Sequence, residues 1–375
     1  MKSNNIKITI ITITYNLKRA GRENTFRQCV ESVHNQTYKN IEHIVVDGAS
    51  TDGSLDLIKE YAKKGWITYI SEPDSGVYDA MNKGLNLATG DYIAFLNSDD
   101  YYHDKKGIQT VVKFILSKKP DFCYGTCNYI TESGDFYGVL KPVVGSFFVR
   151  MPFSHQTLFV NTKLMRKLGG FDAKNFKSAG DYDFIIRLYL SGAKGYKFNT
   201  NFVNYRMGGL SDVQREQSES ECVKSFVKNY AKMDKTIDYK KMFLYFTTTK
   251  TLINNIKKRV CKDVCNEIDE VISRSERCEG DFIRISEYPS VVVKQASSSR
   301  KNIYLFDLIP LLKIKHGYGV KRYLLFHFLP VLKVKFEQYK TKSYFFDFIP
   351  FTNMSDRYGV YKLRIFGIPV LKIKG

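Results

Sequence analysis

Over the first 210 residues, short apolar segments alternate with longer segments in which apolar residues recur every three or four positions. Residues 6–14 are almost all β-branched, as in a strand buried on both faces, and residues 24–34 gather their apolar side chains on one helical face. The same alternation continues with strands at 41–46, 66–70 and 91–96 and helices at 55–62 and 76–88. This spacing predicts an α/β fold with a mainly parallel sheet flanked by helices.

The α/β pattern continues after residue 100 and then changes. We predict a helix at 105–118, a strand at 121–130 that turns at 132–135 into another, an apolar strand after His155, a helix from Asp181 and a strand at 196–205. Residues 212–300 are charged and helical in pattern. We therefore predict an α/β domain at 1–211, a helical connector at 212–300 and a separate module at 301–375.

The last part of the chain repeats itself with a period of about twenty residues. The segment Tyr304–Lys315 recurs as Leu324–Lys335, in shorter form as Tyr344–Pro350, and again as Leu363–Lys374. A fixed period in this range indicates stacked units that share a core. Because the copies end in alternating apolar and lysine residues, we predict a β-rich repeat module that displays lysine and aromatic side chains.

Positive charge is concentrated in that repeat. The whole chain has 58 Lys and Arg against 38 Asp and Glu, a formal charge of +20, and residues 301–375 hold 14 of the former and 4 of the latter. Such an excess implies an anionic partner: nucleic acid, a membrane surface or a phosphorylated substrate. Clustered lysines with aromatic rings favour an anionic inner membrane or a lipid-linked glycan. Contact with another subunit or plain solvation is the next interpretation, and nucleic acid is the least favoured partner.

The sequence also bears on location. No segment approaches the ~20 continuous apolar residues that span a bilayer, and the first residues lack a charged start followed by an apolar run. Seven cysteines, an odd number, fit a reducing compartment. We expect a cytoplasmic protein that is peripheral on the cytoplasmic face of the inner membrane through residues 301–375.

The strongest chemical signal follows the strand at 91–96. Its apolar residues lead directly into Asn97, Ser98, Asp99 and Asp100, so burial of the strand would fix the backbone that presents these polar groups. Adjacent carboxylates repel one another unless a cation lies among them, and oxygen ligands of this kind suit Mg²⁺ or Mn²⁺. A solvated acidic turn is the alternative interpretation, since these are ordinary turn residues.

Two common nucleotide-binding signatures are missing from the sequence. No Gly-x-Gly-x-x-Gly follows the first strand, which argues against a hydride-transferring dinucleotide enzyme, and no glycine-rich loop ends in Gly-Lys-Ser/Thr, which argues against an ATPase. In an open α/β sheet, ligands bind beyond the carboxyl ends of the strands. Asp47, at the end of the second strand, is placed there to accept hydrogen bonds from a base or ribose, or to cap the turn that follows.

Four segments in order resemble the signatures of the family 2 glycosyltransferases, whose fold is GT-A. They are TITYN at 12–16, VVDGASTDGS at 45–54, EPDSGVYDAMNKG at 72–84 and GDYIAFLNSDD at 90–100, within a likeness that spans about residues 6–210. The resemblance implies that Thr14, Tyr15 and Asp47 hold the nucleotide base. It also implies that Asp79 and Lys83 lie near the ribose and diphosphate.

By the same resemblance, Asn97, Ser98 and Asp99 form the Asp-x-Asp metal motif, with Asp99 as the most direct ligand of Mg²⁺ or Mn²⁺. The first carboxylate of the motif is an asparagine in this chain, which removes one charge and is expected either to weaken metal binding or to shift it onto Asp100. Asn97 and Ser98 are then expected to contact the nucleotide sugar.

The catalytic groups are expected in two later segments. His155 begins a His-Gln pair ahead of an apolar strand, and it is predicted either to donate to a diphosphate or to orient an acceptor hydroxyl. Asp181 and Asp183 open a helical pattern, where carboxylates also serve as ordinary helix caps. The segment resembles the family's Glu-Asp motif with Gly180 in place of the glutamate, which implies that Asp181 is the catalytic base and Asp183 a helix-side support.

Together these features predict an inverting, metal-dependent hexosyltransferase. It would move a sugar from a nucleoside-diphosphate sugar, with a UDP-sugar as the expected donor, to a hydroxyl of a growing bacterial surface or lipid-linked glycan. Two alternatives remain from other classes: a nucleotidyltransferase on the same sheet, and a non-catalytic membrane scaffold that binds a nucleotide sugar.

Overall fold

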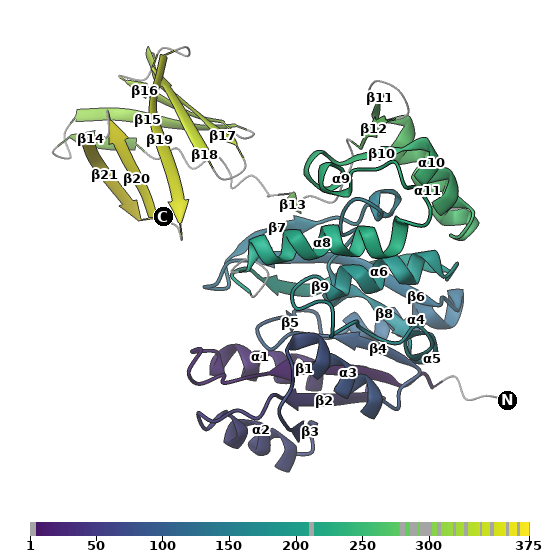
Figure 1. Cartoon of the computed structure of the whole chain (residues 1–375). Helices are drawn as coiled ribbons and strands as arrows, with labels where there is room; N and C mark the ends of the chain where they lie inside the picture. Colours follow the sequence, from purple (N-terminus) through teal and green to yellow (C-terminus); the bar gives the residue numbers. More distant parts are fainter. Residues whose placement is uncertain are drawn as a thin grey trace. The chain divides into compact units, whose positions relative to one another are not determined.

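The computed structural model describes residues 5–209, 214–277, 282–285 and 291–292, together with strands between 302 and 374; from residue 276 on, apart from 282–285, it describes the backbone alone. The chain divides into two compact units, Met1–Lys294 and Gln295–Gly375, which we describe separately (Figure 1). The predicted domain boundaries near 211 and 300 lie outside the described residues.

The centre of the first unit is a parallel sheet in which β1 pairs with β2 on one side and with β4 on the other, and β3 follows β2. The elements of this half are β1 (Ile8–Thr14), α1 (Glu23–His34), β2 (Ile41–Asp47), α2 (Ser54–Lys63), β3 (Thr68–Ser71), α3 (Val77–Leu87) and β4 (Tyr92–Phe95). All begin and end within two residues of the positions predicted from the sequence.

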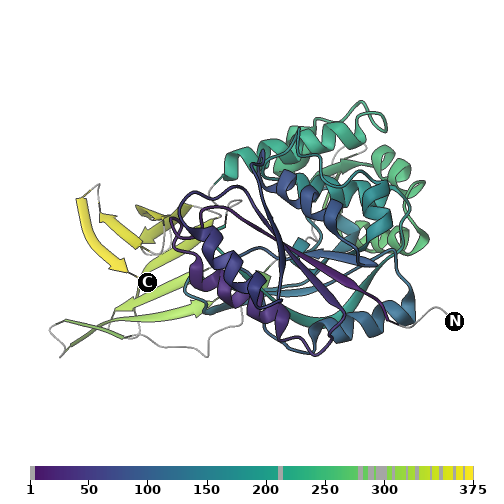
Figure 2. The same ribbon diagram turned by 90° about the horizontal axis from the view of Figure 1, so that it is seen from below.

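Both faces of this sheet are covered, as the β-branched pattern predicted. Ile8 and Ile10 of β1 pack with α1 and α4 (Gly107–Lys118), whereas Ile11 packs with α3 on the opposite face. Figure 2 shows the strands passing between these helices. Thr12 is buried between the layers, where its hydroxyl donates to the carbonyl of Leu96 over 2.8 Å, so the polar side chain costs little to bury.

The second half of the sheet is mixed rather than parallel. β8 (Phe159–Asn161) lies antiparallel between β4 and β6 (Phe122–Ile130), and β6 also pairs with β9 (Gly195–Arg206) in parallel. The remaining elements are β5 (Tyr101–Tyr102), β7 (Phe136–Leu140), the 3₁₀ turns η1 (Val144–Ser146) and η2 (His155–Thr157), α5 (Thr162–Lys167) and α6 (Gly180–Leu190). Because β5 pairs with β9, the acidic segment that precedes β5 is anchored at both ends.

The region predicted as a helical connector contains helices and a small sheet of β10, β12 and β11, and its helices share the core of the first unit. Phe226 and Tyr230 of α8, Leu252 of α10 and Ile268 of α11 pack in the same apolar cluster as Tyr182 of α6. The elements are α8 (Arg215–Tyr230), α9 (Tyr239–Tyr245), β10 (Thr247–Thr249), α10 (Lys250–Lys257), α11 (Lys262–Ser273), β11 (Glu276–Arg277), β12 (Phe282–Arg284) and β13 (Val291–Val292). No helix among the described residues has the length and apolar character required to cross a bilayer.

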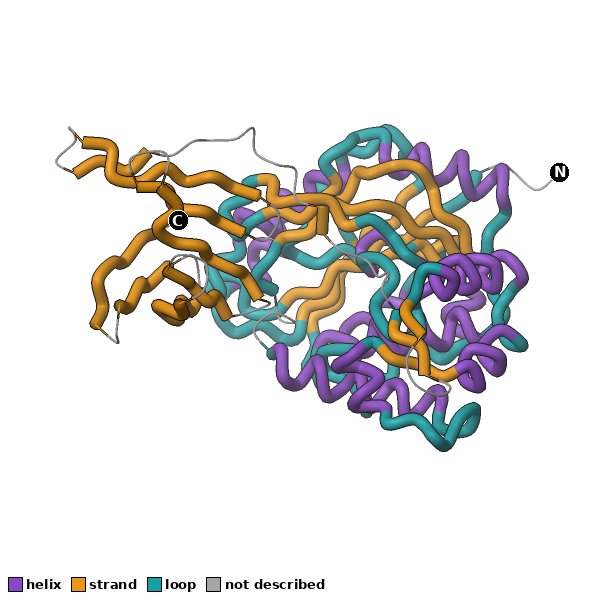
Figure 3. The backbone as a smooth tube through the Cα atoms, turned by 90° about the horizontal axis from the view of Figure 1, so that it is seen from above, coloured by secondary structure: helices purple, strands orange, loops and turns teal. Residues whose placement is uncertain are grey.

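The second unit consists of antiparallel strands, each paired with the next along the chain (Figure 3). They are β14 (Asn302–Leu305), β15 (Ile309–Gly317), β16 (Val320–Leu325), β17 (Leu329–Glu337), β18 (Lys340–Phe345), β19 (Ile349–Arg357), β20 (Val360–Ile365) and β21 (Ile368–Lys374). The register shifts at the same place in each copy, opposite the residue that follows Pro310, Pro330, Pro350 and Pro369. The twenty-residue repeat of the sequence is therefore a repeated β-hairpin with one conserved bulge position.

Candidate active site

The acidic segment after β4 is folded against the sheet by Asp100. Its Oδ1 accepts from the backbone N–H of Arg206 over 2.7 Å, and its Oδ2 accepts from Nε2 of Gln156 over 3.0 Å. Burial and the neighbouring charge of Asp99 raise the pKa of Asp100 well above its usual value, against the effect of those hydrogen bonds. Asp100 therefore fixes the loop from inside, and its predicted role as a metal ligand stays a prediction.

Asp99 is the carboxylate of this corner that reaches the surface. Its Oδ2 pairs with Nη1 of Arg22 over 2.8 Å, and its backbone carbonyl accepts from Nε of Arg206 over 3.1 Å. Arg22 precedes α1 and Arg206 ends β9, so two guanidinium groups from distant elements meet at the end of β4. Arg22 thus places a positive charge on the carboxylate at which we expect a divalent cation.

The donor set still suits a divalent cation. Asn97 and Asp99 offer oxygen atoms, which Mg²⁺ and Mn²⁺ prefer, and such ions complete their coordination with water and substrate phosphates. Among the described residues no three His, Cys, Asp or Glu side chains gather as a cage for a metal. The corner therefore fits a cation held through Asp99 and completed by a bound diphosphate.

The residues predicted to hold a nucleotide base lie together at the ends of β1 and β2. The hydroxyl of Thr14 donates to Asp47 over 3.2 Å, and Asp47 also accepts from Ser50 and from the hydroxyl of Ser71. Asp47 is fully buried, so in this geometry it shapes the loop after β2. Tyr15 is 64% exposed, which leaves an aromatic ring available for stacking.

Asp79 and Lys83 share one face of α3. Oδ2 of Asp79 accepts from the backbone N–H of Ser75, and Nζ of Lys83 lies 2.9 Å from Glu72 and 4.0 Å from Asp79. The hydrogen bond to Glu72 is the main cause that raises the pKa of Lys83. Lys83 is therefore a charged ammonium group at the loop that precedes α3, as a role near a diphosphate requires.

His155 and Asp181 are brought into direct contact. Nδ1 of His155 lies 3.1 Å from Oδ2 of Asp181, while Oδ1 accepts from the hydroxyl of Tyr78 over 3.0 Å and from the N–H of Tyr182 over 2.9 Å. Burial opposes ionisation of Asp181, but the hydrogen bonds from His155 and Tyr78 outweigh it and lower the pKa. Nε2 of His155 is buried without a hydrogen-bond partner among the described residues.

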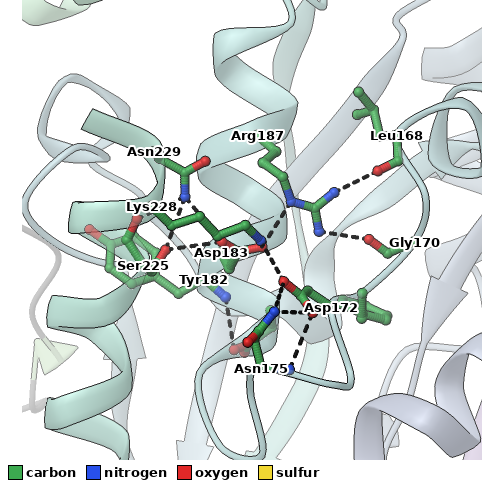
Figure 4. Close-up of polar contacts among 12 residues, drawn as sticks. Leu168, Gly170, Asp172, Asn175, Tyr182, Asp183, Arg187, Ser225, Lys228 and Asn229 are labelled. Atoms are coloured by element: carbon green, nitrogen blue, oxygen red, sulfur yellow. Dashed lines mark hydrogen bonds and ion pairs between the residues drawn. The ribbon is translucent and has the colours of Figure 1, made fainter. Parts of the chain in front are cut away.

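Asp183 has a different environment on the other side of α6. Its carboxylate is fully buried and is contacted by Arg187 over 2.8 Å, Lys228 over 3.0 Å and Asn229 over 3.0 Å (Figure 4). The guanidinium of Arg187 also donates to the carbonyls of Leu168 and Gly170. Asp183 therefore joins α6, α8 and the turn before α6, which agrees with the supporting role predicted for it.

The start of α6 is held by a carboxylate from α8. Glu221 accepts hydrogen bonds from the backbone N–H groups of Lys177, Ser178 and Ala179, at 2.8 to 3.0 Å. A negative charge at a helix N-terminus is favourable because the first N–H groups have no partner within the helix. This contact sets the backbone that immediately precedes Gly180 and Asp181.

Gly180 is required by the ring of Tyr78. A Cβ atom at position 180 would lie 2.8 Å from two ring atoms of Tyr78, closer than side chains approach one another. The glutamate that the resemblance expected here would therefore displace the tyrosine that donates to Asp181. The departure at Gly180 and the contact between Tyr78 and Asp181 belong to one local arrangement.

Three of the predicted residues, His155, Asp181 and Asp100, are linked to one another, whereas Thr14 and Asp47 form a separate pair. Tyr78, next to Asp79, binds Asp181; Asp181 binds His155; and Gln156, next to His155, binds Asp100. Sequence reasoning left Tyr78, Gln156, Arg22, Arg206 and Glu221 without roles. Tyr78 and Gln156 lie within motifs that were noted, whereas the other three lie in segments without a motif.

Comparison with known proteins identifies the family of the chain. The family model described as Glycosyl transferase family 2 matches residues 9–181. A PGL/p-HBAD biosynthesis glycosyltransferase of Mycobacterium tuberculosis (strain ATCC 25177 / H37Ra) is 32% identical over 189 residues, 49% of this chain and 73% of that protein. Glycosyltransferase GlyA of Streptococcus pneumoniae serotype 4 is 34% identical over 157 residues, 41% of this chain and 21% of GlyA, so the chain spans about a fifth of GlyA.

Solved structures to which the chain is similar include S. aureus TarS 1-349 in complex with UDP, with a TM-score of 0.46 and 16% identity over 76% of this chain and 98% of that one. Another is the mannosyltransferase PcManGT of Pyrobaculum calidifontis in complex with GDP-Man and Mn²⁺, with a TM-score of 0.47 and 17% identity over 72% of this chain and 75% of that one. The family model and the mycobacterial relative confirm the resemblance and the α/β architecture expected from it: this chain belongs to glycosyl transferase family 2.

Proposed function

We propose that this protein is an inverting glycosyltransferase that moves a sugar from a nucleoside-diphosphate sugar, with UDP-sugar as the expected donor, to a hydroxyl of a surface or lipid-linked glycan. The observation that carries the proposal is the contact between Asp181 and His155, joined through Gln156 to the acidic corner. A proton-accepting carboxylate and a site for a leaving diphosphate thus belong to one network.

The proposed reaction is a single displacement at the anomeric carbon. Asp181 takes the proton of the acceptor hydroxyl as its oxygen forms the new glycosidic bond, and the bond from the anomeric carbon to the diphosphate oxygen breaks. The electron pair of that bond leaves with the nucleoside diphosphate. His155 and Tyr78 hold the two carboxylate oxygens of Asp181, so the base is oriented before the acceptor arrives.

The acidic corner would serve the departing group. A bound Mg²⁺ or Mn²⁺ supplies electrostatic stabilisation of the diphosphate charge, with Asp99 as the residue that holds it and Asn97 beside it. Lys83 is an ammonium group available to the same phosphates. We assign stacking on the base to Tyr15, whose ring is exposed at the end of β1.

We propose that the second unit brings this activity to an anionic surface, namely the cytoplasmic face of the inner membrane or its lipid-linked acceptor. The strand register supports this, because residues paired directly across strands share a face of the sheet. Lys315 pairs with Arg322, Arg322 with Lys333, and Lys335 with Lys342, so basic positions from successive hairpins share one face. Near an anionic membrane each such charge contributes about 1 kcal/mol.

Product analysis tests the proposed function. The full chain is incubated with Mn²⁺, a panel of UDP-, GDP- and dTDP-sugars and lipid-linked acceptors, and the products are identified by mass spectrometry and by NMR of the anomeric centre. We expect release of a nucleoside diphosphate and a glycoside of inverted configuration. Release of pyrophosphate would indicate a nucleotidyltransferase, and donor binding without any product would indicate a scaffold.

A further inference from the structure

Arg22 occupies the carboxylate that the proposed function gives to a cation. Its Nη1 lies 2.8 Å from Oδ2 of Asp99, and the side chains of Arg22 and Asp99 are 39% and 10% exposed. The backbone carbonyl of Arg22 accepts from Phe26 at the start of α1 and from the hydroxyl of Thr25. The helix start therefore depends on the backbone of Arg22, and the guanidinium is left for Asp99.

The two arginines of the corner differ in how firmly they are held. The guanidinium of Arg206 donates to the carbonyls of Asp99, Thr131 and Glu132 and to Gln28, so it is fixed on several sides. Among the described residues, the guanidinium of Arg22 has its hydrogen bond to Asp99 alone. Arg22 can therefore leave Asp99 at a smaller cost in free energy than Arg206 can.

A divalent cation and a guanidinium cannot share one carboxylate oxygen without strong repulsion at such distances. A cation that binds Asp99 must therefore displace Arg22 or approach beside it at reduced affinity. A diphosphate changes the balance, because its oxygens can ligate the cation and accept the guanidinium at the same time.

We propose that Arg22 is a built-in counter-cation of Asp99 that opposes metal binding in the absence of donor and transfers to the diphosphate when donor and metal bind together. The inference rests on the proposed function, since it assumes a nucleoside-diphosphate donor at this corner. It assigns Arg22 a binding role of its own. The consequence is coupled binding: the metal is held weakly alone and firmly with the nucleotide.

Calorimetric titration of the full chain tests the proposal with Mn²⁺ alone, UDP alone and UDP in saturating Mn²⁺. For Arg22→Met we expect Mn²⁺ alone to bind about three- to tenfold more tightly than to wild type, because the competing charge is gone. UDP with Mn²⁺ should bind about tenfold more weakly, because a charge-assisted contact is lost. Arg22→Lys should restore part of both effects.

The matched control is Arg27→Met on α1, the helix that Arg22 precedes. Arg27 pairs with Glu60 over 3.2 Å and is as exposed as Arg22, so its removal should change neither Mn²⁺ nor UDP binding. Wild-type Mn²⁺ affinity in Arg22→Met, or wild-type UDP affinity in saturating Mn²⁺, would overturn the proposal. A wild-type chain that shows the coupled binding but transfers no sugar would overturn the proposed function and leave the role of Arg22 standing.

Discussion

Helix α6 carries two carboxylates in its first turn, and the comparison of its two sides separates structure from chemistry. Asp183 faces α8, is fully buried, and is met by the charged groups of Arg187 and Lys228. Asp181 faces α3 and η2, keeps 18% of its side chain exposed, and is met by an imidazole and a phenol. Residues two apart on a helix do not share a face, so one turn serves both environments.

This difference shows how the reactive carboxylate of two neighbouring ones can be recognised. The charge of Asp183 is compensated by the cationic groups of Arg187 and Lys228, so Asp183 is committed to holding α6 against α8. Asp181 instead has hydrogen bonds from an imidazole and a phenol, and 18% of its side chain is exposed to solvent. Exposure and the chemistry of the partners distinguish the two residues, whereas the residue type does not.

The largest effect is expected from Asp181→Asn. Loss of a general base typically costs 10²–10⁴ in rate, so we expect turnover to fall by about a thousandfold while UDP affinity stays within about threefold of wild type. The shape of the side chain is kept, so the unfolding midpoint in urea should change little. Turnover assays and calorimetry on the same preparation measure both quantities, and wild-type turnover would show that Asp181 is not the base.

Asp183→Asn should give the opposite result. Among the described residues, removing the charge of Asp183 leaves Arg187 without a carboxylate partner and Lys228 with Asp172 alone, and we expect a loss of about 3 kcal/mol in the free energy of unfolding. The folded fraction of this variant should keep turnover within about tenfold of wild type. Urea titration and turnover assays at low temperature test this prediction. Unchanged stability together with lost activity would contradict it.

A smaller effect is expected from Glu221→Gln, which weakens the cap on α6. Hydrogen bonds to a charged group are each worth about 1.5–3 kcal/mol, and we expect about 2 kcal/mol in total because the amide oxygen still accepts. Burial opposes the charge of Glu221, but the N–H groups of Ser178 and Ala179 outweigh it and lower the pKa.

The lowered pKa of Glu221 determines how its contribution to stability depends on pH. The carboxylate of Glu221 stabilises the folded state fully above its unfolded pKa, and this contribution is lost as pH falls through the lower folded pKa. The difference in unfolding free energy between wild type and Glu221→Gln should therefore be largest near neutral pH and shrink in acid. A difference that grows in acid would contradict the assignment.

The smallest effect is expected from Tyr78→Phe. It removes one hydrogen bond from Asp181, so the pKa of Asp181 should rise and the acid limb of kcat/KM should move upward by less than about one pH unit. Tyr182→Phe is the control, because the Tyr182 hydroxyl donates to the carbonyl of Phe147 and not to Asp181. An acid limb that moves equally in both variants would show a general effect of α6.

The sequence predicted the parts of this site that follow from local order. Apolar burial of β4 places Asn97 to Asp100 at the edge of the sheet, and the His-Gln pair and the Asp181 segment could be recognised by type and surroundings. The contacts of Arg22 and Arg206 with Asp99 join residues 77 and 107 positions apart. No periodicity encodes such a contact, since it depends on how β9 and the start of α1 pass the end of β4.

Gly180 shows the same limit at a single position. Its difference from the family motif is visible in the sequence, but the cause is the ring of Tyr78, about a hundred residues earlier in the chain. Similarly, the repulsion between Asp99 and Asp100 could be anticipated as a need for positive charge. Which groups supply that charge depended on the fold.

The bulge that recurs after Pro310, Pro330, Pro350 and Pro369 makes the second unit extensible. Neighbouring strands lie about 4.8 Å apart, so one hairpin adds about 10 Å of width to the sheet. Deleting or duplicating a whole twenty-residue copy preserves the alternation of strands and the kind of edge left at each end. The width of the second unit can thus vary in steps of one hairpin.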